Sequence, residues 1–383
     1  MLSHETLPTE LWLEVFDHLD NHRSFTVSHA PFQPIPGVAN ENKVCHDYFT
    51  LVLVCRKWRA WALERLYRNY KLSKTAKSPL QYANWVRRAV VPYTTTATET
   101  HKPMPSTEIL SRLPNLVVLV RPPYAPSPLR NPRFEFDATC PPLPQLKRLD
   151  WWNYIEASRS GGINSLTSVL KRAPNIEYLF VGGAFSHFTA VAFHGLDIAA
   201  SIHLPRLRTL RINISDALLL RHVMQRWELP ALENFVFDSP LVTGSIGSRL
   251  LWETMGSRLT TVEFGKHVRF LLDDHLGPCL RGCPLLRQVN YYLFITAALV
   301  AEENETFPNL ECIGVSLSHT PFLGGEAEEW EHLWRHVDVF CSGVLPNLHT
   351  LKLWDTKPIL HSDIRLRDMR RRLETKGIVI QFC

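Results

Sequence analysis

Two histidines, His332 and His336, stand one helical turn apart and have Glu329 and Asp338 beside them. Imidazole groups at positions i and i+4 of a helix can hold a transition metal between them. The alternative, which we favour, is a histidine pair on the surface of an acidic helix. The pattern is therefore a weak indication of a metal, and we expect no metal site.

The thiols are a second group that could bind a metal or form crosslinks. Of the eight cysteines only Cys279 and Cys283 lie close together, and no second close pair follows that would complete a zinc site. We expect reduced, mostly buried thiols in an intracellular protein, cytoplasmic or nuclear. The N-terminus has neither the basic nor the apolar region of a signal peptide.

Motifs that bind nucleotides or carry nucleophiles are also missing. The sequence contains no Gly-x-Gly-x-x-Gly, no Walker phosphate loop and no His-Glu-x-x-His. The run at 244–248 lacks the spacing of a nucleophile elbow around its serine. We therefore predict no catalytic residues and no cofactor, and we look next at the elements that could bind a partner.

The first 70 residues contain two helical patterns. Apolar residues at 11, 12, 15, 16 and 19 follow a helical period, and Pro8 suits the first turn of that helix. Residues 20–47 contain Pro31, Pro34, Pro36 and Gly37 and predict a long loop, after which residues 49–66 predict one more helix. Both helices carry more apolar surface than they can bury against each other, which indicates a partner.

The charge is concentrated in the same region. The whole chain has a formal net charge of +5, and residues 56–88 hold ten basic residues with one acid, Glu64. Such a patch favours an acidic partner, although it could instead be a solvated face. The rest of the chain is nearly neutral and has no apolar run long enough for a membrane span, so we predict neither nucleic-acid binding nor membrane insertion.

Two motifs in this region resemble an F-box. The first is Leu7-Pro8-x-Glu10-Leu11 with its apolar continuation, and the second is Val54-Cys55-Arg56-Lys57-Trp58. The resemblance covers residues 5–70 and departs from the family in the length of the loop 20–47. It implies docking on an acidic Skp-type adaptor of a cullin ubiquitin ligase. The adaptor contacts that it implies are Leu7, Pro8, Leu11, Val15, Phe16, Leu19, Leu51, Val54, Cys55 and Trp58.

Past residue 110 a phrase of the form Leu-Pro-x-Leu recurs nine times, about 29 residues apart, with Ser257 in place of proline in one copy. The second, fifth and seventh residues after each proline are apolar in 26 of 27 cases, and Arg121 is the exception. The fifth and seventh alternate as in a strand with one buried face. Helical stretches such as 163–172, 215–227 and 326–340 lie between phrases, and a basic helix at 364–376 precedes a last strand at 378–382.

These repeats resemble an irregular leucine-rich-repeat horseshoe built of strand-turn-helix units. The fold class that we predict is α/β, with an F-box module at 1–72, a helical or linker junction at 73–110 and the repeats at 111–383. In such a solenoid the residues between the buried ones point into a concave surface that binds a target. They are Arg148, Asp150, Trp152, Tyr178, Phe180, Arg211, Asp238, Glu263, Asn290, Tyr292, Lys352 and Trp354.

Together these features predict a non-catalytic substrate receptor of a Skp-cullin-F-box ubiquitin ligase, with an unidentified protein substrate. Two alternatives stay open. One is an F-box and repeat scaffold without ligase activity, and the other is a solenoid that binds a small ligand in an apolar pocket on its concave side. The proline-rich segments 121–142 and 92–106 are rival binding elements, unless they are only spacers.

Overall fold

The computed structural model describes residues 8–19, 26–35, 42–71, 80–91, 106–122, 139–152, 163, 165–183, 201–213, 217–238, 245–266, 268, 274–318, 326–355 and 363–383. They form a mixed α/β protein with twelve parallel strands. The chain divides into two compact units, whose main boundary lies between Leu207 and Arg208. The second unit also includes Ala30–Gln33, a short piece of the predicted loop.

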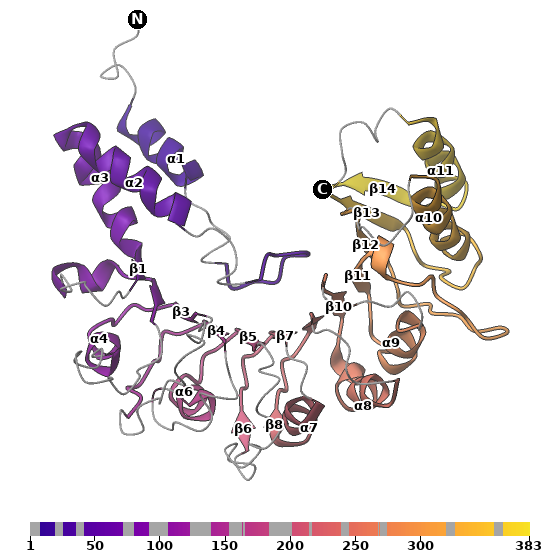
Figure 1. The fold of residues 1–383 in the computed structure, drawn as a ribbon, viewed down its shortest axis with the longest axis horizontal. Coiled ribbons are helices and arrows are strands. Elements are labelled where there is room, and N and C mark those ends of the chain that lie inside the picture. The colour runs from indigo at the N-terminus through magenta and orange to yellow at the C-terminus, as the bar shows by residue number, and fades with distance from the viewer. Residues whose placement is uncertain are drawn as a thin grey trace, which may run out of the picture. The chain divides into compact units, whose positions relative to one another are not determined.

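Three helices open the first unit: α1 (Thr9–Leu19), α2 (Asn42–Val54) and α3 (Arg56–Arg68) (Figure 1). The prediction of a single second helix was wrong, because the backbone is extended at Cys55 and α2 ends before it. The Cys55 thiol accepts a hydrogen bond from the Trp58 N–H at 3.4 Å and so caps the start of α3. Helix α2 also begins earlier than expected, inside the predicted loop.

A core of Phe16, Tyr48 and Ala62 holds the three helices together. The Tyr48 hydroxyl donates to the Phe16 carbonyl oxygen at 2.7 Å, which ties α2 to α1. The ring of Trp58 on α3 lies 4.8 Å from that of Trp12 and 5.3 Å from that of Phe16. The bundle therefore fills its interior with its own aromatic side chains.

The first unit continues with a parallel ladder in which each strand pairs with the next. Its strands are β1 (Asn69–Lys71), β2 (Arg88–Val90), β3 (Val118–Arg121), β4 (Arg148–Trp151) and β5 (Tyr178–Gly182), followed by the short β6 (Ile202–His203). Its connecting helices are η2 (Leu80–Trp85), α4 (Ser106–Ser111) and α6 (Leu166–Arg172). The ladder thus starts before the first proline phrase, with β1 at the end of the predicted F-box module and β2 inside the predicted junction.

The second unit repeats the same plan. Its ladder runs in the order β7 (Thr209–Asn213), β9 (Asn234–Phe237), β10 (Thr261–Phe264), β11 (Gln288–Tyr292), β12 (Cys312–Ser316), β13 (Thr350–Trp354) and β14 (Val379–Phe382). The other elements are α7 (Ala217–Arg226), β8 (Trp227–Glu228), α8 (Ser245–Met255), η5 (Gly256–Arg258), α9 (Leu276–Gly282), η6 (Leu293–Ile295), α10 (Glu326–Phe340) and α11 (Ile364–Glu374). Helices α8 to α11 lie along one side of the strands (Figure 1).

The phase of the repeats is confirmed. All 27 positions at the second, fifth and seventh places are buried, and none is more than 5% exposed. Arg121, the polar exception, is 0% exposed and donates to the carbonyl oxygens of Val91 at 3.2 Å and Ile163 at 2.6 Å. Strand register follows the same phase, since the fourth residue after one proline pairs with its equivalent in the next repeat, as Arg148 does with Tyr178.

Asparagine reinforces the turns, a signal that the sequence analysis missed. The residue after proline is asparagine in four phrases, and each side chain donates to a carbonyl oxygen of the preceding repeat at 2.7 to 2.9 Å. These residues are Asn115, Asn175, Asn309 and Asn347. The amide thus satisfies a backbone acceptor where one turn stacks on the last.

The end of the chain agrees with the prediction. Helix α11 ends at Glu374, Gly377 takes a left-handed φ of +75°, and the Ile378 N–H returns to the Leu373 carbonyl oxygen at 3.0 Å. Strand β14 then pairs in parallel with β13 and closes that edge of the ladder.

Candidate functional site

The residues that the F-box resemblance selects fall into three groups. Leu11, Val15 and Val54 are exposed, by 45%, 46% and 55%, and Pro8 is exposed as well. Leu51, Cys55 and Trp58 are half-buried. Leu7 and the side chain of Leu19 lie outside the described residues. The exposed members are placed where a partner could contact them.

Phe16 differs from the prediction that it contacts an adaptor. It is 1% exposed and lies in the bundle core, where its ring packs against Trp58 and Trp61. Trp58 and Leu51 also pack against this core. The helical period places Phe16 one residue beyond Val15 and so on the inner side of α1.

Two exposed apolar residues of α2 were missed. Phe49 is 55% exposed and Leu53 is 69% exposed, the highest value among the large exposed hydrophobic side chains. They stand four residues apart on one face of the helix, as Leu11 and Val15 do on α1. We call Leu11, Val15, Phe49, Leu53 and Val54 the apolar docking surface. The spacing of residues 49 and 53 indicates that they share one face of a helix. Whether that face points outward depends on where α2 begins, which the sequence pattern did not show.

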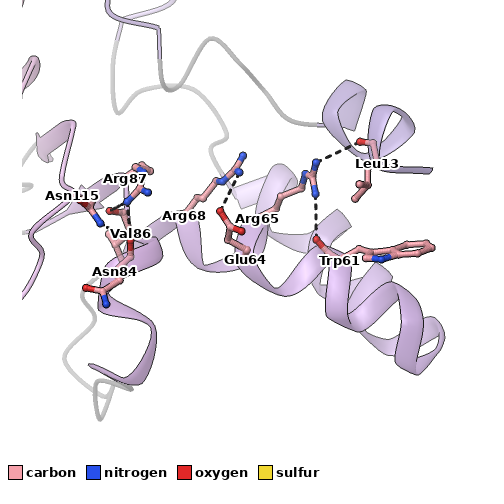
Figure 2. Close-up of polar contacts among 9 residues, drawn as sticks. All are labelled: Leu13, Trp61, Glu64, Arg65, Arg68, Asn84, Val86, Arg87 and Asn115. Carbon is pink, nitrogen blue, oxygen red and sulfur yellow. Dashed lines mark hydrogen bonds and ion pairs between the residues drawn. The ribbon is translucent and has the colours of Figure 1, made fainter. Parts of the chain in front are cut away.

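Basic side chains distinguish α3 from the other two helices. Arg56, Lys57 and Arg59 are exposed near its start. Figure 2 shows Arg65 between two helices, donating to the Trp61 carbonyl oxygen at 3.2 Å and to the Leu13 carbonyl oxygen at 3.5 Å. Arg65 thereby fastens α3 to α1.

A backbone hydrogen bond joins the end of α3 to the ladder. Arg68 pairs with Glu64 at 3.2 Å (Figure 2), and the Arg68 carbonyl oxygen accepts the Arg87 N–H at 2.9 Å. The Arg87 and Asn115 side chains both donate to the Asn84 carbonyl oxygen. The helical bundle is therefore joined to the ladder of the first unit by a backbone hydrogen bond at the end of α3, while Arg56, Lys57 and Arg59 at the start of α3 are exposed.

The predicted concave-face residues are mostly buried, which corrects the expectation of an open face. Nine of the twelve are no more than 8% exposed, and the other three, Tyr292, Lys352 and Trp354, are half-buried. Part of the burial arises within the ladder, because equivalent residues on neighbouring strands pack side by side. The ring of Trp152 at the end of β4, for example, lies 5.0 Å from that of Phe180 on β5. The remainder comes from a segment that the sequence predicted to be only a loop.

Residues 26–35, which we call the strap, contact this face in both units. In the first unit, Arg148 donates to the Thr26 carbonyl oxygen at 2.7 Å. Ile35 is 6% exposed and packs in a cluster with Trp152, Tyr178 and Phe180. The guanidinium of Arg148 also lies 4.5 Å from the centre of the Tyr178 ring and bonds Asp150 at 3.0 Å. The strap thus covers both apolar and charged members of the face.

In the second unit the strap contributes Ala30–Gln33. The Phe32 ring lies 5.1 Å from the Tyr292 ring and 5.8 Å from the Trp354 ring, edge-on to both. The Phe32 N–H donates to Glu263 Oε2 at 3.0 Å, and Arg211 donates to the Gln33 carbonyl oxygen at 2.8 Å. Four of the predicted face residues therefore contact Phe32 and Gln33, two consecutive residues of the strap.

Two buried carboxyl groups, those of Asp238 and Glu263, interact with Arg211 beneath the strap. Arg211 pairs with Asp238 at 2.7 Å, and both side chains are buried. A side-chain carbon at Gly265 would lie 2.2 Å from Asp238 Oδ1, so glycine leaves room for that carboxylate. Burial raises the pKa of Glu263 to about 7, against the opposing effects of Arg211 and the Phe32 N–H, while Asp238 adds to the rise. The Arg211 guanidinium thus pairs with Asp238 and also lowers the pKa of Glu263.

The histidine pair does not lie on the surface as expected. His332 Nε2 lies 3.0 and 2.9 Å from the carbonyl oxygens of Leu293 and Thr296. His336 is 1% exposed and bonds the Tyr291 hydroxyl at 3.0 Å, and burial lowers its pKa to about 3. Among the described residues no three histidine, cysteine or acidic side chains form a group that could hold a metal. The pair fastens α10 to the segment after β11.

The other expected features have these positions. Cys279 and Cys283 are buried, and burial raises the pKa of Cys279 well above its ordinary value.

A small apolar pocket lies between the ladder and helices α9 and α10, lined by residues such as Val289, Tyr291 and Phe340. It is on the helix side of the strands, so it is not the concave-side pocket that a small-ligand solenoid predicts. Segments 92–106 and 121–142 lie mostly outside the described residues.

No helix in the described part of the chain is long and apolar enough to cross a membrane. Comparison of the sequence with protein-family models gives no match, and a search of the curated proteins gives no significant one.

Proposed function

We propose that the chain is the substrate-recognition subunit of a Skp-cullin-F-box ubiquitin ligase. Its helical bundle binds an acidic Skp-type adaptor, and its leucine-rich-repeat-like ladder binds a target protein. The chain performs no chemistry of its own in this role. It holds the target near the ubiquitin-transferring subunits, so that transfer is accelerated by proximity.

The apolar docking surface is the observation that carries this proposal. The bundle already has a filled core of Phe16, Tyr48 and Ala62, yet it leaves five large hydrophobic side chains at least 45% exposed on α1 and α2. Burying such side chains against a partner contributes about 1.5–3 kcal/mol each at most. A patch of this kind on a folded module is typical of a protein-binding surface.

The charge of α3 supports an acidic partner in particular. Arg56, Lys57 and Arg59 are exposed at the start of the helix, next to the Cys55 turn that separates it from Val54. Opposite charge speeds association and selects the partner, while the apolar contacts supply most of the affinity. An acidic adaptor surface fits this combination.

The experiment is a binding assay between the full chain and a purified acidic Skp-type adaptor. Leu53→Asp places a charge at the most exposed of the five docking-surface residues, a side chain that the bundle core does not use. Leu285→Asp is the matched control, since Leu285 is a leucine of similar exposure (53%) in the second unit. We expect Leu53→Asp to abolish capture of the adaptor and Leu285→Asp to leave it intact.

Co-purification of the cullin distinguishes the ligase receptor from the scaffold alternative. A ligase receptor brings down the adaptor together with the cullin, and the complex ubiquitinates a bound target in a reconstituted reaction. A scaffold brings down the adaptor alone. Adaptor capture that is equal for the wild type and Leu53→Asp would contradict the docking surface itself.

A further inference from the structure

The side chain of Phe32 is seated between two aromatic rings of the second unit. Tyr292 extends from the end of β11 and Trp354 from the end of β13, and both meet the Phe32 ring edge-on at 5.1 and 5.8 Å. Such edge-to-face contacts between aromatic rings are favourable and orient the ring that they hold. The two strands therefore form a seat for one aromatic side chain.

The polar contacts beside this seat are made to backbone groups. Glu263 accepts the N–H of Phe32, and Arg211 donates to the carbonyl oxygen of Gln33. An N–H and a C=O on consecutive residues are present in almost any peptide, so these contacts do not depend on the strap's own sequence. Buried charged groups make strong hydrogen bonds of this kind. The seat thus recognises an aromatic side chain and the backbone around it.

The strap fills the seat at a conformational cost. Phe32 has a φ of +55°, the left-handed region that a non-glycine residue adopts only when its surroundings impose it. Residues 26–35 form no strand and add none to the ladder, so side-chain contacts hold them in place. Backbone strain of this type weakens the hold of the segment that carries it. A peptide that offers the same groups without the strain would bind the seat more tightly.

We infer that Arg211, Glu263, Tyr292 and Trp354 form a peptide-binding site for an aromatic residue in a segment of the target, and that Phe32 occupies it as an internal competing ligand. The inference rests on the proposed function in that it names what the ladder binds. Target binding then requires the strap to leave the seat. Because residues 20–41 connect α1 to α2, the competing ligand belongs to the same stretch of chain as the docking module.

The test is fluorescence anisotropy with a labelled synthetic peptide of the sequence of residues 28–36, added to the full chain. Phe32→Ala weakens the internal ligand, so the peptide is expected to bind this variant about tenfold or more tightly than the wild type. Adding Trp354→Ala to Phe32→Ala should remove that binding. Val300→Ala, an exposed site of the second unit outside the seat, is the control and should bind as the wild type does. A peptide with alanine in place of its phenylalanine should not bind.

Equal affinity of the wild type and Phe32→Ala, or no binding to either, would overturn the inference. Loss of fold in Phe32→Ala moves the decision to hydrogen exchange on the wild type. Excess peptide should then speed exchange of the amides of residues 30–33, including the Phe32 N–H that Glu263 now holds. Unchanged exchange at these amides would show that the strap is a permanent brace and would also overturn the inference.

The same variants separate this inference from the proposed function. Phe32→Ala should capture the acidic adaptor as the wild type does, and Leu53→Asp in the Phe32→Ala chain should keep the peptide while losing the adaptor. If only the peptide-binding results fail, the peptide-binding site is refuted. If only the adaptor-binding results fail, the docking surface is refuted.

Discussion

The helical bundle and the strand ladder differ in which side chains they expose and which they bury. The bundle buries aromatic side chains inside and leaves leucine, valine and phenylalanine exposed on α1 and α2. The ladder carries arginine, aspartate and glutamate among its aromatic residues, and these are buried, several of them under residues 26–35. An exposed apolar patch suits a partner that is always available, whereas a covered polar face suits one that must compete for access.

The largest effect should come from the buried charges of the ladder. Arg211→Met leaves Asp238 and Glu263 without their guanidinium, and losing one member of a buried ion pair costs about 3–5 kcal/mol. The free energy of unfolding from urea denaturation measures it. Lys147→Met is the matched control, because Lys147 pairs with Glu177 at 3.1 Å in a solvent-exposed position that contributes at most about 1 kcal/mol. Equal losses of unfolding free energy in the two variants would mean that Arg211 and its partners are not buried.

A similar loss is expected inside the bundle. Phe16→Ala removes a ring that is 1% exposed, and truncating a buried phenylalanine costs about 3–5 kcal/mol. Urea denaturation of this variant beside the wild type provides the measurement. A loss below about 1 kcal/mol would show that Phe16 lies on an interaction surface after all, as the F-box resemblance implies.

The third prediction concerns pH and Glu263. The carboxyl group ionises near 4.5 in the unfolded chain and at about 7 in the folded one, so the folded state loses stability as pH rises from 4.5 to 7. The shift corresponds to about 3 kcal/mol. Arg211, Asp238, Tyr292 and the Phe32 N–H face this group. Glu263→Gln removes this carboxyl group, so its unfolding free energy should fall less between pH 4.5 and 8 than that of the wild type. Parallel pH profiles of the two chains would contradict the prediction.

The smallest effect should come from the neighbour of Phe16. Val15→Asp changes a side chain that is 46% exposed, and such a surface change alters unfolding by about 0.5 kcal/mol or less. Thermal or urea denaturation measures this, with Phe16→Ala as the adjacent comparison. A loss approaching that of Phe16→Ala would place Val15 in the bundle core and remove it from the docking surface.

The repeats could be predicted from the sequence because their period and their buried positions are local. Proline cannot continue a helix or join a ladder, so each phrase marks a turn, and the alternating apolar residues after it give the strand and its inner face. All 27 of those positions are buried. Strands β1 and β2 were not predicted, since no proline phrase precedes them.

The sites could be predicted only in part, because exposure depends on distant contacts. The apolar period predicted helices at 8–19 and 49–66, but the extended backbone at Cys55 divides the second into α2 and α3, and Phe49 and Leu53 on α2 are exposed. The residues predicted for the concave face alternate with the apolar strand positions, and part of their burial depends on Phe32 and Ile35, which precede them by more than a hundred residues. No periodicity in residues 26–35 indicates where that segment packs.

The most direct test of the account is a calorimetric titration of the acidic Skp-type adaptor into the wild-type chain, Leu53→Asp and Leu285→Asp. We expect the same affinity for the wild type and Leu285→Asp, and a loss of about thirtyfold or more for Leu53→Asp, the effect of placing a charge in a hydrophobic contact. The same affinity for all three chains, or no binding by the wild type, would contradict it.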